Sequence, residues 1–117
     1  MRNLERHYKL VNKEAIPCND LNEFAESFGF DERRVDSTKI GSILVSTVFL
    51  GLDHQFGDGP PLLFETMVFG GVYDQKMNRY TTWEQAEAGH KEMADKVQKA
   101  FNEEILDPKK LEPNMPG

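Results

Sequence analysis

The sequence predicts an α+β fold: an antiparallel sheet of three to five strands, a long C-terminal helix packed on one face, and a short N-terminal helix. Two runs rich in β-branched and aromatic residues, 43–52 and 62–69, are separated only by the Gly/Pro loop 53–61. A loop this short joins antiparallel strands, because a parallel crossover needs about a dozen residues or more. Residues 82–105 then repeat apolar side chains at helical spacing, which indicates one long amphipathic helix.

The N-terminal part of the chain predicts a short strand followed by a short helix. Residues 7–11 favour the strand. Asp20, followed three positions later by Glu23, is typical of a helix N-terminus. Apolar residues then recur at helical spacing until Gly29, a residue that commonly ends helices. We therefore predict a helix over 20–29.

The sheet is expected to gain two further short strands. Residues 33–39 predict a strand that precedes the 43–52 strand, and Gly41-Ser42 offers the tight turn between them, with glycine at its first position. After a polar connection, residues 78–81 predict a short strand just before the long helix.

The C-terminal helix has recognisable ends and one apolar stripe. Thr81 or Thr82 is expected to cap it, with Glu84 or Gln85 at the matching capping-box position, and residues 107–108 are expected to end it. The stripe consists of Trp83, Ala86, His90, Met93, Val97, Ala100 or Phe101, and Ile105.

Length and composition limit the class of protein. The 117 residues predict one domain over 1–108, with a Pro-containing tail at 109–117 that is expected to be disordered. A net charge of -6 without a basic face argues against duplex nucleic acid as a partner. The single cysteine, Cys18, fits a reducing compartment and is expected to be a packed structural thiol. No signal peptide is expected at the N-terminus, and the longest apolar run, around 43–52, is too short to span a membrane.

The central hairpin predicts that both faces of the sheet need cover. If Leu52 pairs with Leu62, the even-numbered residues of both strands share one face and the odd-numbered residues share the other. Both faces are then apolar. The long helix covers one, and either the N-terminal helix or a second copy of the chain covers the other, so we expect a homo-oligomer.

Glu65 interrupts an otherwise apolar strand. A carboxylate inside such a strand needs a partner or a raised pKa. The favoured interpretation is a structural ion pair with Arg33, Arg34 or Arg79. The alternative is a carboxylate that binds a ligand or acts as a general base.

Two further places contain groups capable of chemistry. Asp53-His54 lies where a strand meets a Gly/Pro loop, and the residues there are either functional or merely orient the turn. His90 lies on the apolar stripe, which favours a satisfied core histidine, and Gly89 suggests the close approach of another backbone. Glu87 and His90 have the i, i+3 spacing of some metal sites, but the three histidines show no ligand pattern, so we predict no metal and no cofactor.

The most useful site prediction is a ligand pocket at the loop end of the central hairpin. A Gly/Pro loop beside a rigid sheet forms a shaped rim, and aromatic side chains there could stack on a ring. The residues predicted to contribute are Asp53, His54, Phe56, Glu65, Arg33, Arg34, Tyr80 and His90.

The central motif resembles a family of small bacteriophage and phage-derived proteins. The resemblance lies in residues 46–54, 59–71 and 79–90, with 17–18 and 33–35 upstream, and it extends over most of 7–98. It implies a phage accessory protein that acts in the host bacterial cytoplasm. It implies no activity, and no functional residue is transferred from it.

Three classes of function follow from these observations. The first is a counter-defence protein that binds a small host molecule, such as a nucleotide signal, without catalysis. The second is an inhibitor that docks on a host defence protein. The third is a small hydrolase-type enzyme that would use Asp53, His54, Glu65 and His90, although no set of nucleophile, base and orienting residue is recognisable.

Overall fold

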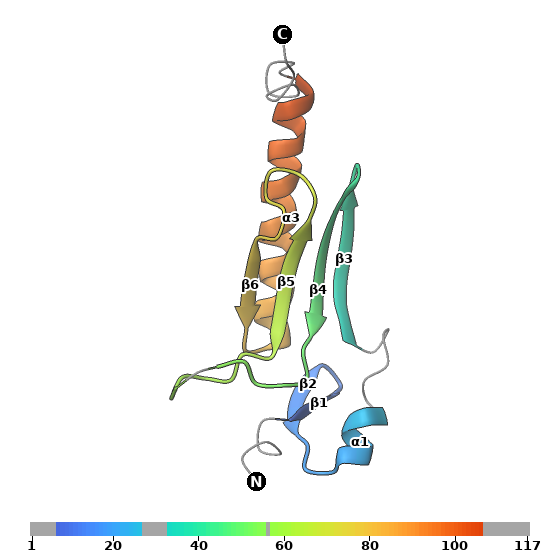
Figure 1. Cartoon of the computed structure of the whole chain (residues 1–117), viewed down its shortest axis with the longest axis vertical. Coiled ribbons are helices and arrows are strands. Elements are labelled where there is room, and N and C mark those ends of the chain that lie inside the picture. Colours follow the sequence, from blue (N-terminus) through green and yellow to red (C-terminus); the bar gives the residue numbers. More distant parts are fainter. Residues whose placement is uncertain (1–6, 27–32, 56, 107–117) are drawn as a thin grey trace.

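The part of the chain that the structure describes forms two antiparallel sheets and two helices. The structure is a computed structural model, and it describes residues 7–26, 33–55 and 57–106 (Figure 1). The expected tail at 109–117, the end of the predicted N-terminal helix at 27–29, and Phe56 lie outside the described residues. The elements are β1 (Tyr8–Val11), β2 (Glu14–Pro17), α1 (Leu21–Glu26), β3 (Arg34–Ile40), β4 (Ile43–Phe49), β5 (Phe64–Phe69), β6 (Met77–Tyr80) and α3 (Trp83–Leu106).

The main sheet and the long helix form two layers. The four strands follow one another in the order β3-β4-β5-β6, each antiparallel to the next, and α3 runs along one face (Figure 1). The turn between β3 and β4 is the predicted one: Gly41 has a φ of 62°, which glycine adopts at little cost. The α+β prediction, with its long C-terminal helix on one face of an antiparallel sheet, is confirmed.

The register of the central hairpin differs from the prediction by one residue. Phe49 pairs with Phe64, and Val45 pairs with Val68. The predicted pairing of Leu52 with Leu62 is therefore wrong. Regular pairing ends because Gly51 adopts a φ of 81°, and the chain turns away towards the N-terminal hairpin.

This slip moves one strand's side chains to the opposite face, since successive residues of a strand alternate. The odd-numbered residues of β4 now share the helix-covered face with the even-numbered residues of β5. Both candidate registers give two apolar faces, so the hydrophobic pattern alone could not distinguish them. The side chains beneath α3 include Ile43, Val45, Thr47, Phe49, Phe64, Thr66 and Val68.

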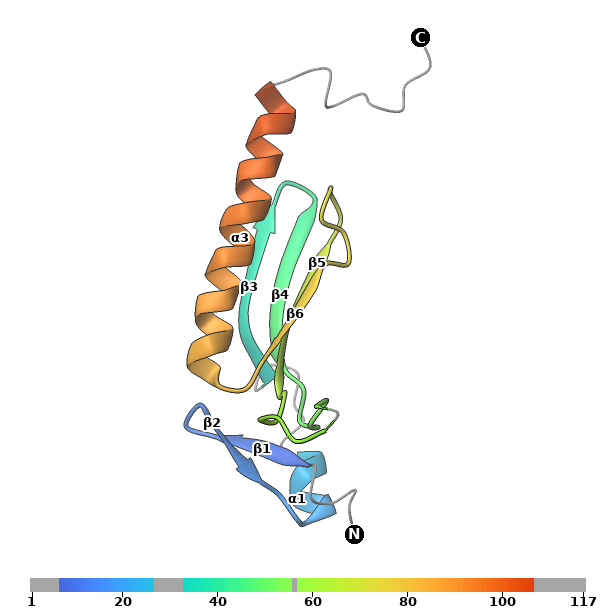
Figure 2. The ribbon, with the colours of Figure 1, turned by 90° about the vertical axis from the view of Figure 1, so that its left-hand side faces the viewer.

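The core between the sheet and α3 has two clusters. One is buried against the middle of the helix and consists of Ile40, Ile43, Val45, Val68, Met93 and Val97. The other lies nearer the start of the helix and consists of Phe49, Leu63, Phe64 and Ala86. Phe101 packs on the first cluster and Trp83 on the second, as the stripe predicts. Ile105 is 51% exposed because α3 extends past the end of the sheet (Figure 2).

A second hairpin, which the sequence analysis missed, precedes α1. Strands β1 and β2 pair through a turn in which Asn12 and Lys13 have φ values of 52° and 70°. Positive φ at both central residues is the pattern of a type I′ turn, for which Asn-Gly is the strong sequence signal. Lys at the second position hides that signal. Helix α1 starts as predicted, with Asp20 Oδ1 accepting hydrogen bonds from the amides of Asn22 (2.9 Å) and Glu23 (3.3 Å).

The N-terminal hairpin and α1 lie beyond one end of the main sheet and not over its second face (Figure 2). Two backbone contacts after the end of β4 join them to the rest of the protein. Tyr8 N donates to Gly51 O at 2.8 Å, and His7 forms an isolated antiparallel β-bridge with Leu52. The alternative in which the N-terminal helix covers the second face is therefore wrong. Self-association through that face stays a prediction.

The second face of the main sheet is mixed in character. Phe69 and Met77 are 46% and 39% exposed there. Glu65 Oε2 lies 3.1 Å from Arg79 Nε on the neighbouring strand, in a pair that is only partly exposed. The structural ion-pair interpretation of Glu65 is thus confirmed, with Arg79 as the partner. Among the described residues, no helix is both long enough and apolar enough to cross a membrane.

Candidate functional site

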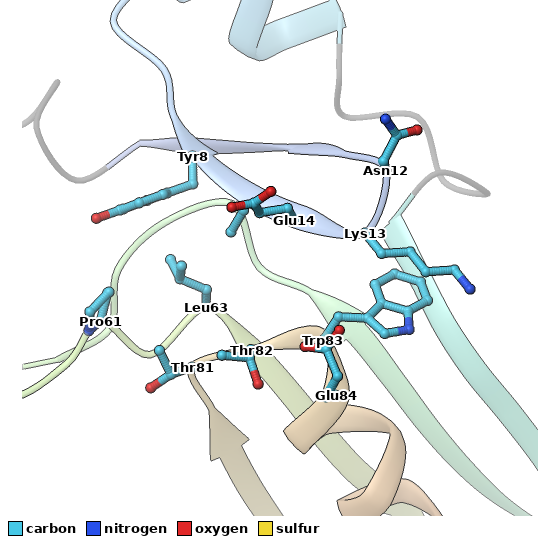
Figure 3. Close-up of a pocket in the computed structure, with 11 residues that line it drawn as sticks. Tyr8, Asn12, Lys13, Glu14, Pro61, Leu63, Thr81, Thr82, Trp83 and Glu84 are labelled. Atoms are coloured by element: carbon cyan, nitrogen blue, oxygen red, sulfur yellow. The ribbon is translucent and has the colours of Figure 1, made fainter.

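A pocket of about 460 Å³ lies between the N-terminal hairpin and the start of α3 (Figure 3). It is at the same end of the main sheet as the Gly/Pro loop. Its lining comes from three separate segments of the chain. These are Tyr8, Asn12, Lys13, Glu14 and Ala15 of the hairpin, Pro61 and Leu63 before β5, and Thr81, Thr82, Trp83 and Glu84 at the start of α3.

The start of α3 is held in place by a capping box. Gln85 N donates to Thr82 Oγ1 at 3.1 Å, and Gln85 Oε1 accepts from the amides of Thr82 (3.2 Å) and Thr81 (3.0 Å). The predicted cap is confirmed, with Thr82 as the capping residue and Gln85 as its partner. Leu63 N also donates to Tyr80 O at 2.9 Å, which ties the floor of the pocket to β6. The lower rim is therefore rigid backbone rather than a loose loop.

Trp83 forms one wall of the pocket. Its ring meets the buried Phe64 edge-on, with centroids 6.2 Å apart and an interplanar angle of 87°. The ammonium of Lys13 lies over the indole at 5.5 Å from the ring centroid, a cation–π contact between the hairpin tip and the helix. The indole Nε1–H is buried and has no hydrogen-bond partner among the described residues. Such unsatisfied donors are uncommon in folded proteins.

The charges of the pocket are mostly negative. The Glu14 carboxylate projects from the hairpin into the hollow above Leu63, with Tyr8 beside it (Figure 3). Glu84 adds a second carboxylate on the first turn of α3, and Lys13 is the single cationic side chain of the lining. The pocket thus combines an apolar and aromatic surface with carboxylate acceptors. Such a surface disfavours a phosphate-rich ligand, despite the helix N-terminus nearby.

A second polar feature lies beneath α3 and crosses the whole sheet. Tyr80 Oη donates to Thr66 Oγ1 at 3.2 Å, and Thr66 Oγ1 is hydrogen bonded to Thr47 Oγ1. Thr47 Oγ1 lies 2.7 Å from Nδ1 of His90, whose Nε2 lies 2.8 Å from Thr38 Oγ1. These five side chains form one continuous chain of hydrogen bonds from β6 to β3.

Only the first of these hydrogen bonds has a fixed direction, because a threonine hydroxyl and a histidine ring nitrogen can each donate or accept. One arrangement that agrees with the Tyr80 donor has Thr66 donate to Thr47 and Thr47 donate to Nδ1 of His90. A neutral ring that accepts at Nδ1 carries its proton on Nε2 and donates to Thr38. His90 is 1% exposed with both nitrogens engaged, so it matches the interpretation of a satisfied core histidine.

Burial keeps His90 neutral. Loss of hydration lowers the pKa of His90 below its ordinary value, and the nearby Asp36 carboxylate partly opposes this effect by raising it. Asp36 Oδ2 lies 3.8 Å from Nε2, but half of the Asp36 side chain is in contact with solvent. Solvent weakens the attraction, which explains why desolvation is the larger influence on the pKa.

Gly89 has a different role from the one predicted. A side chain and not a backbone approaches it: a Cβ at this position would overlap the ring of Tyr80. The glycine therefore lets the Tyr80 ring lie close to α3 and extend its hydroxyl to Thr66. The expectation of a backbone contact is corrected accordingly.

Three of the predicted site residues form hydrogen bonds to the protein's own backbone. Asp53 Oδ1 accepts from the amides of Gln55 (2.8 Å) and Leu62 (2.9 Å), so it braces the loop. His54 Nδ1 is 2.9 Å from Leu52 O. Arg33 Nε donates to Phe49 O at 3.1 Å.

None of these three residues lines the pocket, and neither does the exposed Arg34 on β3. Glu65 lies on the face of the sheet opposite His90. Tyr80 and His90 are brought together through Thr66 and Thr47. Among the residues that the structure describes, no three His, Cys, Asp or Glu side chains are grouped closely enough to hold a metal ion.

Sequence reasoning missed the pocket because its main residues are far apart in the chain. The sequence pattern assigns Trp83 only to the apolar stripe and Tyr8 only to a short strand. The signal that could have found the hairpin is Asn12 between two strand-like segments, despite Lys13 at the position that favours glycine.

No family model, no curated protein and no solved structure matches the chain.

Proposed function

We propose that this protein binds a small molecule without catalysis, and that the pocket between the β1–β2 hairpin and the start of α3 is its binding site. The observation that carries the proposal is the composition of this pocket. An apolar floor at Leu63 and aromatic walls from Tyr8 and Trp83 converge with a few polar groups. That combination, at a volume of about 460 Å³, is typical of small-molecule sites.

The proposed biological role is sequestration of a host molecule by a phage accessory protein in the bacterial cytoplasm. The family resemblance of the central motif motivates this part of the proposal. Of a nucleotide signal, the pocket would suit the base and sugar better than the phosphates, because Glu14 and Glu84 repel anions. The expected ligand is therefore a molecule with a flat ring and few negative charges.

The arrangement of the suspected catalytic residues favours binding over catalysis. Asp53 braces a loop, Glu65 pairs with Arg79 on the open face of the sheet, and His90 is enclosed on the other face. Residues on opposite faces of one sheet cannot act together on one substrate. Docking on a host defence protein remains the alternative function.

Tryptophan fluorescence tests the proposal, because Trp83 is the only tryptophan of the chain and lies in the pocket. Small molecules released from protein purified out of phage-infected cells are identified by mass spectrometry and added back to ligand-free protein. We expect a saturable change in Trp83 emission. Tyr8→Ala should abolish it, whereas Tyr73→Ala, a matched change at the other core cluster, should leave it intact. Retention of the released molecule by Tyr8→Ala would place binding elsewhere.

A further inference from the structure

We infer that the ligand of this pocket is an organic cation: an ammonium, guanidinium or protonated ring amine attached to an apolar or flat group. The inference rests on the proposed function and names the chemical class for the same pocket. Two independent features of the pocket lead to it, an aromatic face that already holds a cation and a carboxylate aimed into the hollow.

The first feature is the contact between Lys13 and Trp83. An ammonium over an indole is held by the negative face of the ring, and tryptophan is the best of the aromatic side chains for this contact. Lys13 Nζ lies 5.5 Å from the Trp83 centroid. Trp83 thus presents a cation-binding face in the wall of the pocket, and the Lys13 ammonium occupies it.

The position of Lys13 supports its role as an internal stand-in for the ligand. Its φ of 70° belongs to a region that side chains other than Gly, Asn and Asp rarely adopt. Turn chemistry therefore does not explain a lysine here, whereas the contact with Trp83 does. A ligand cation can displace this ammonium, because Lys13 is at an exposed hairpin tip and can return to water.

The second feature is Glu14, the neighbour of Lys13. Its carboxylate lies above Leu63 and extends towards Tyr8 (Figure 3). Among the described residues, no ion pair or hydrogen bond engages this side chain. A carboxylate at the edge of an aromatic site supplies the charge-assisted hydrogen bond that an ammonium or guanidinium requires. Glu84 adds a second negative charge that offsets the positive end of the α3 dipole.

These two features predict opposite effects for neighbouring substitutions. Lys13→Gln removes the internal competitor and should tighten the binding of a cation. Glu14→Gln removes the charge partner and should weaken it. A pocket that merely buried apolar surface would respond little to either change, since both substitutions remove a charge at an exposed position.

Three probes that share a phenethyl group and differ in charge provide the test: phenethylammonium, its neutral N-acetyl derivative, and the anion 3-phenylpropanoate. Each is titrated into the full-length protein while Trp83 emission is recorded. We expect the cation to bind most tightly and the anion least. Lys13→Gln should strengthen cation binding several-fold, and Glu14→Gln should weaken it about tenfold, the loss of one good charged contact.

The chain offers matched controls for both substitutions. Lys96 Nζ lies 5.6 Å over the Tyr73 ring, so Lys96→Gln removes a comparable cation–π contact and the same charge away from the pocket. Glu92→Gln neutralises an exposed carboxylate on α3. Both controls should leave probe binding unchanged. Thermal unfolding of every variant shows whether a loss of binding reflects a loss of fold.

The outcomes separate this inference from the proposed function. Equal binding of the three probes, or tightest binding of the anion, overturns the cation class while small-molecule binding stands. The cation class is also overturned, and small-molecule binding stands, if no probe binds but the molecule released from infected cells still changes Trp83 emission. If neither probes nor released molecules change it, both the class and the proposed function fail.

Discussion

The ring of Tyr80 lies directly against Gly89, so that a Cβ at position 89 would overlap it. This contact joins the last strand of the sheet to the second turn of α3 and directs the Tyr80 hydroxyl to Thr66 at 3.2 Å. The contact with the Tyr80 ring explains why glycine, a poor helix former, stands inside this helix.

Gly89→Ala should therefore destabilise the protein, although alanine is the better helix former by about 1 kcal/mol. Overpacking of this kind costs about 1–3 kcal/mol in the free energy of unfolding, which urea denaturation measures. The sign should reverse in a Tyr80→Ala background, where the ring is gone and helix propensity alone remains. Destabilisation of equal size in both backgrounds would show that the ring is not the cause.

Thr47→Val should be strongly destabilising despite its nearly identical shape. It leaves Nδ1 of His90 and the Thr66 hydroxyl without their partner in a buried site. We expect a loss of about 1–3 kcal/mol by denaturant unfolding. Ser46→Ala, one residue away on the open face of β4, should cost within about 0.5 kcal/mol. Similar losses for both variants would contradict the assignment of faces.

The stability of the protein should fall as the pH decreases below neutrality. The pKa of His90 in the folded protein lies below its ordinary value of 6.5, so the unfolded chain binds the proton first as the pH falls. The contribution of neutral His90 is therefore complete above about pH 6.5 and is lost progressively below it.

Unfolding experiments at neutral pH and at about pH 5 should show this loss in the wild type and in His54→Gln. The loss should be smaller in His90→Gln, which has no group that titrates there. An unchanged pH dependence in His90→Gln would contradict the assignment. Nitrogen chemical shifts should, in addition, show the Nε2–H form of His90 near neutral pH, because the Asp36 carboxylate lies 3.8 Å from Nε2 and favours a proton there.

The ion pair between Glu65 and Arg79 should contribute modestly to stability. Their side chains are 17% and 31% exposed, and their strands place them opposite each other. A double-mutant cycle with Glu65→Gln and Arg79→Gln should give a coupling energy of about 0.5–1 kcal/mol that decreases with added salt. A coupling that is insensitive to salt would point to hydrogen bonding rather than charge as its source.

Local features of the sequence determined the type and order of most elements. The β-branched runs around Val45 and Val68, the turn at Gly41 and the cap at Thr82 each depend on neighbours a few residues away. Chain connectivity then required antiparallel pairing of the central strands. The helical periodicity of the apolar residues also identified which side of α3 faces the sheet, because the buried residues of a helix recur about every 3.6 positions.

Only the tertiary structure decided the register, the partners of His90 and the place of the pocket. Both registers of the central hairpin bury apolar residues, and the bend at Gly51 towards Tyr8 selects between them. The hydrogen bonds of His90 come from separate strands of the sheet, and the pocket joins Tyr8 to Trp83 across most of the chain. Such contacts depend on three-dimensional packing, since no local pattern records which distant side chain will supply a partner or a wall.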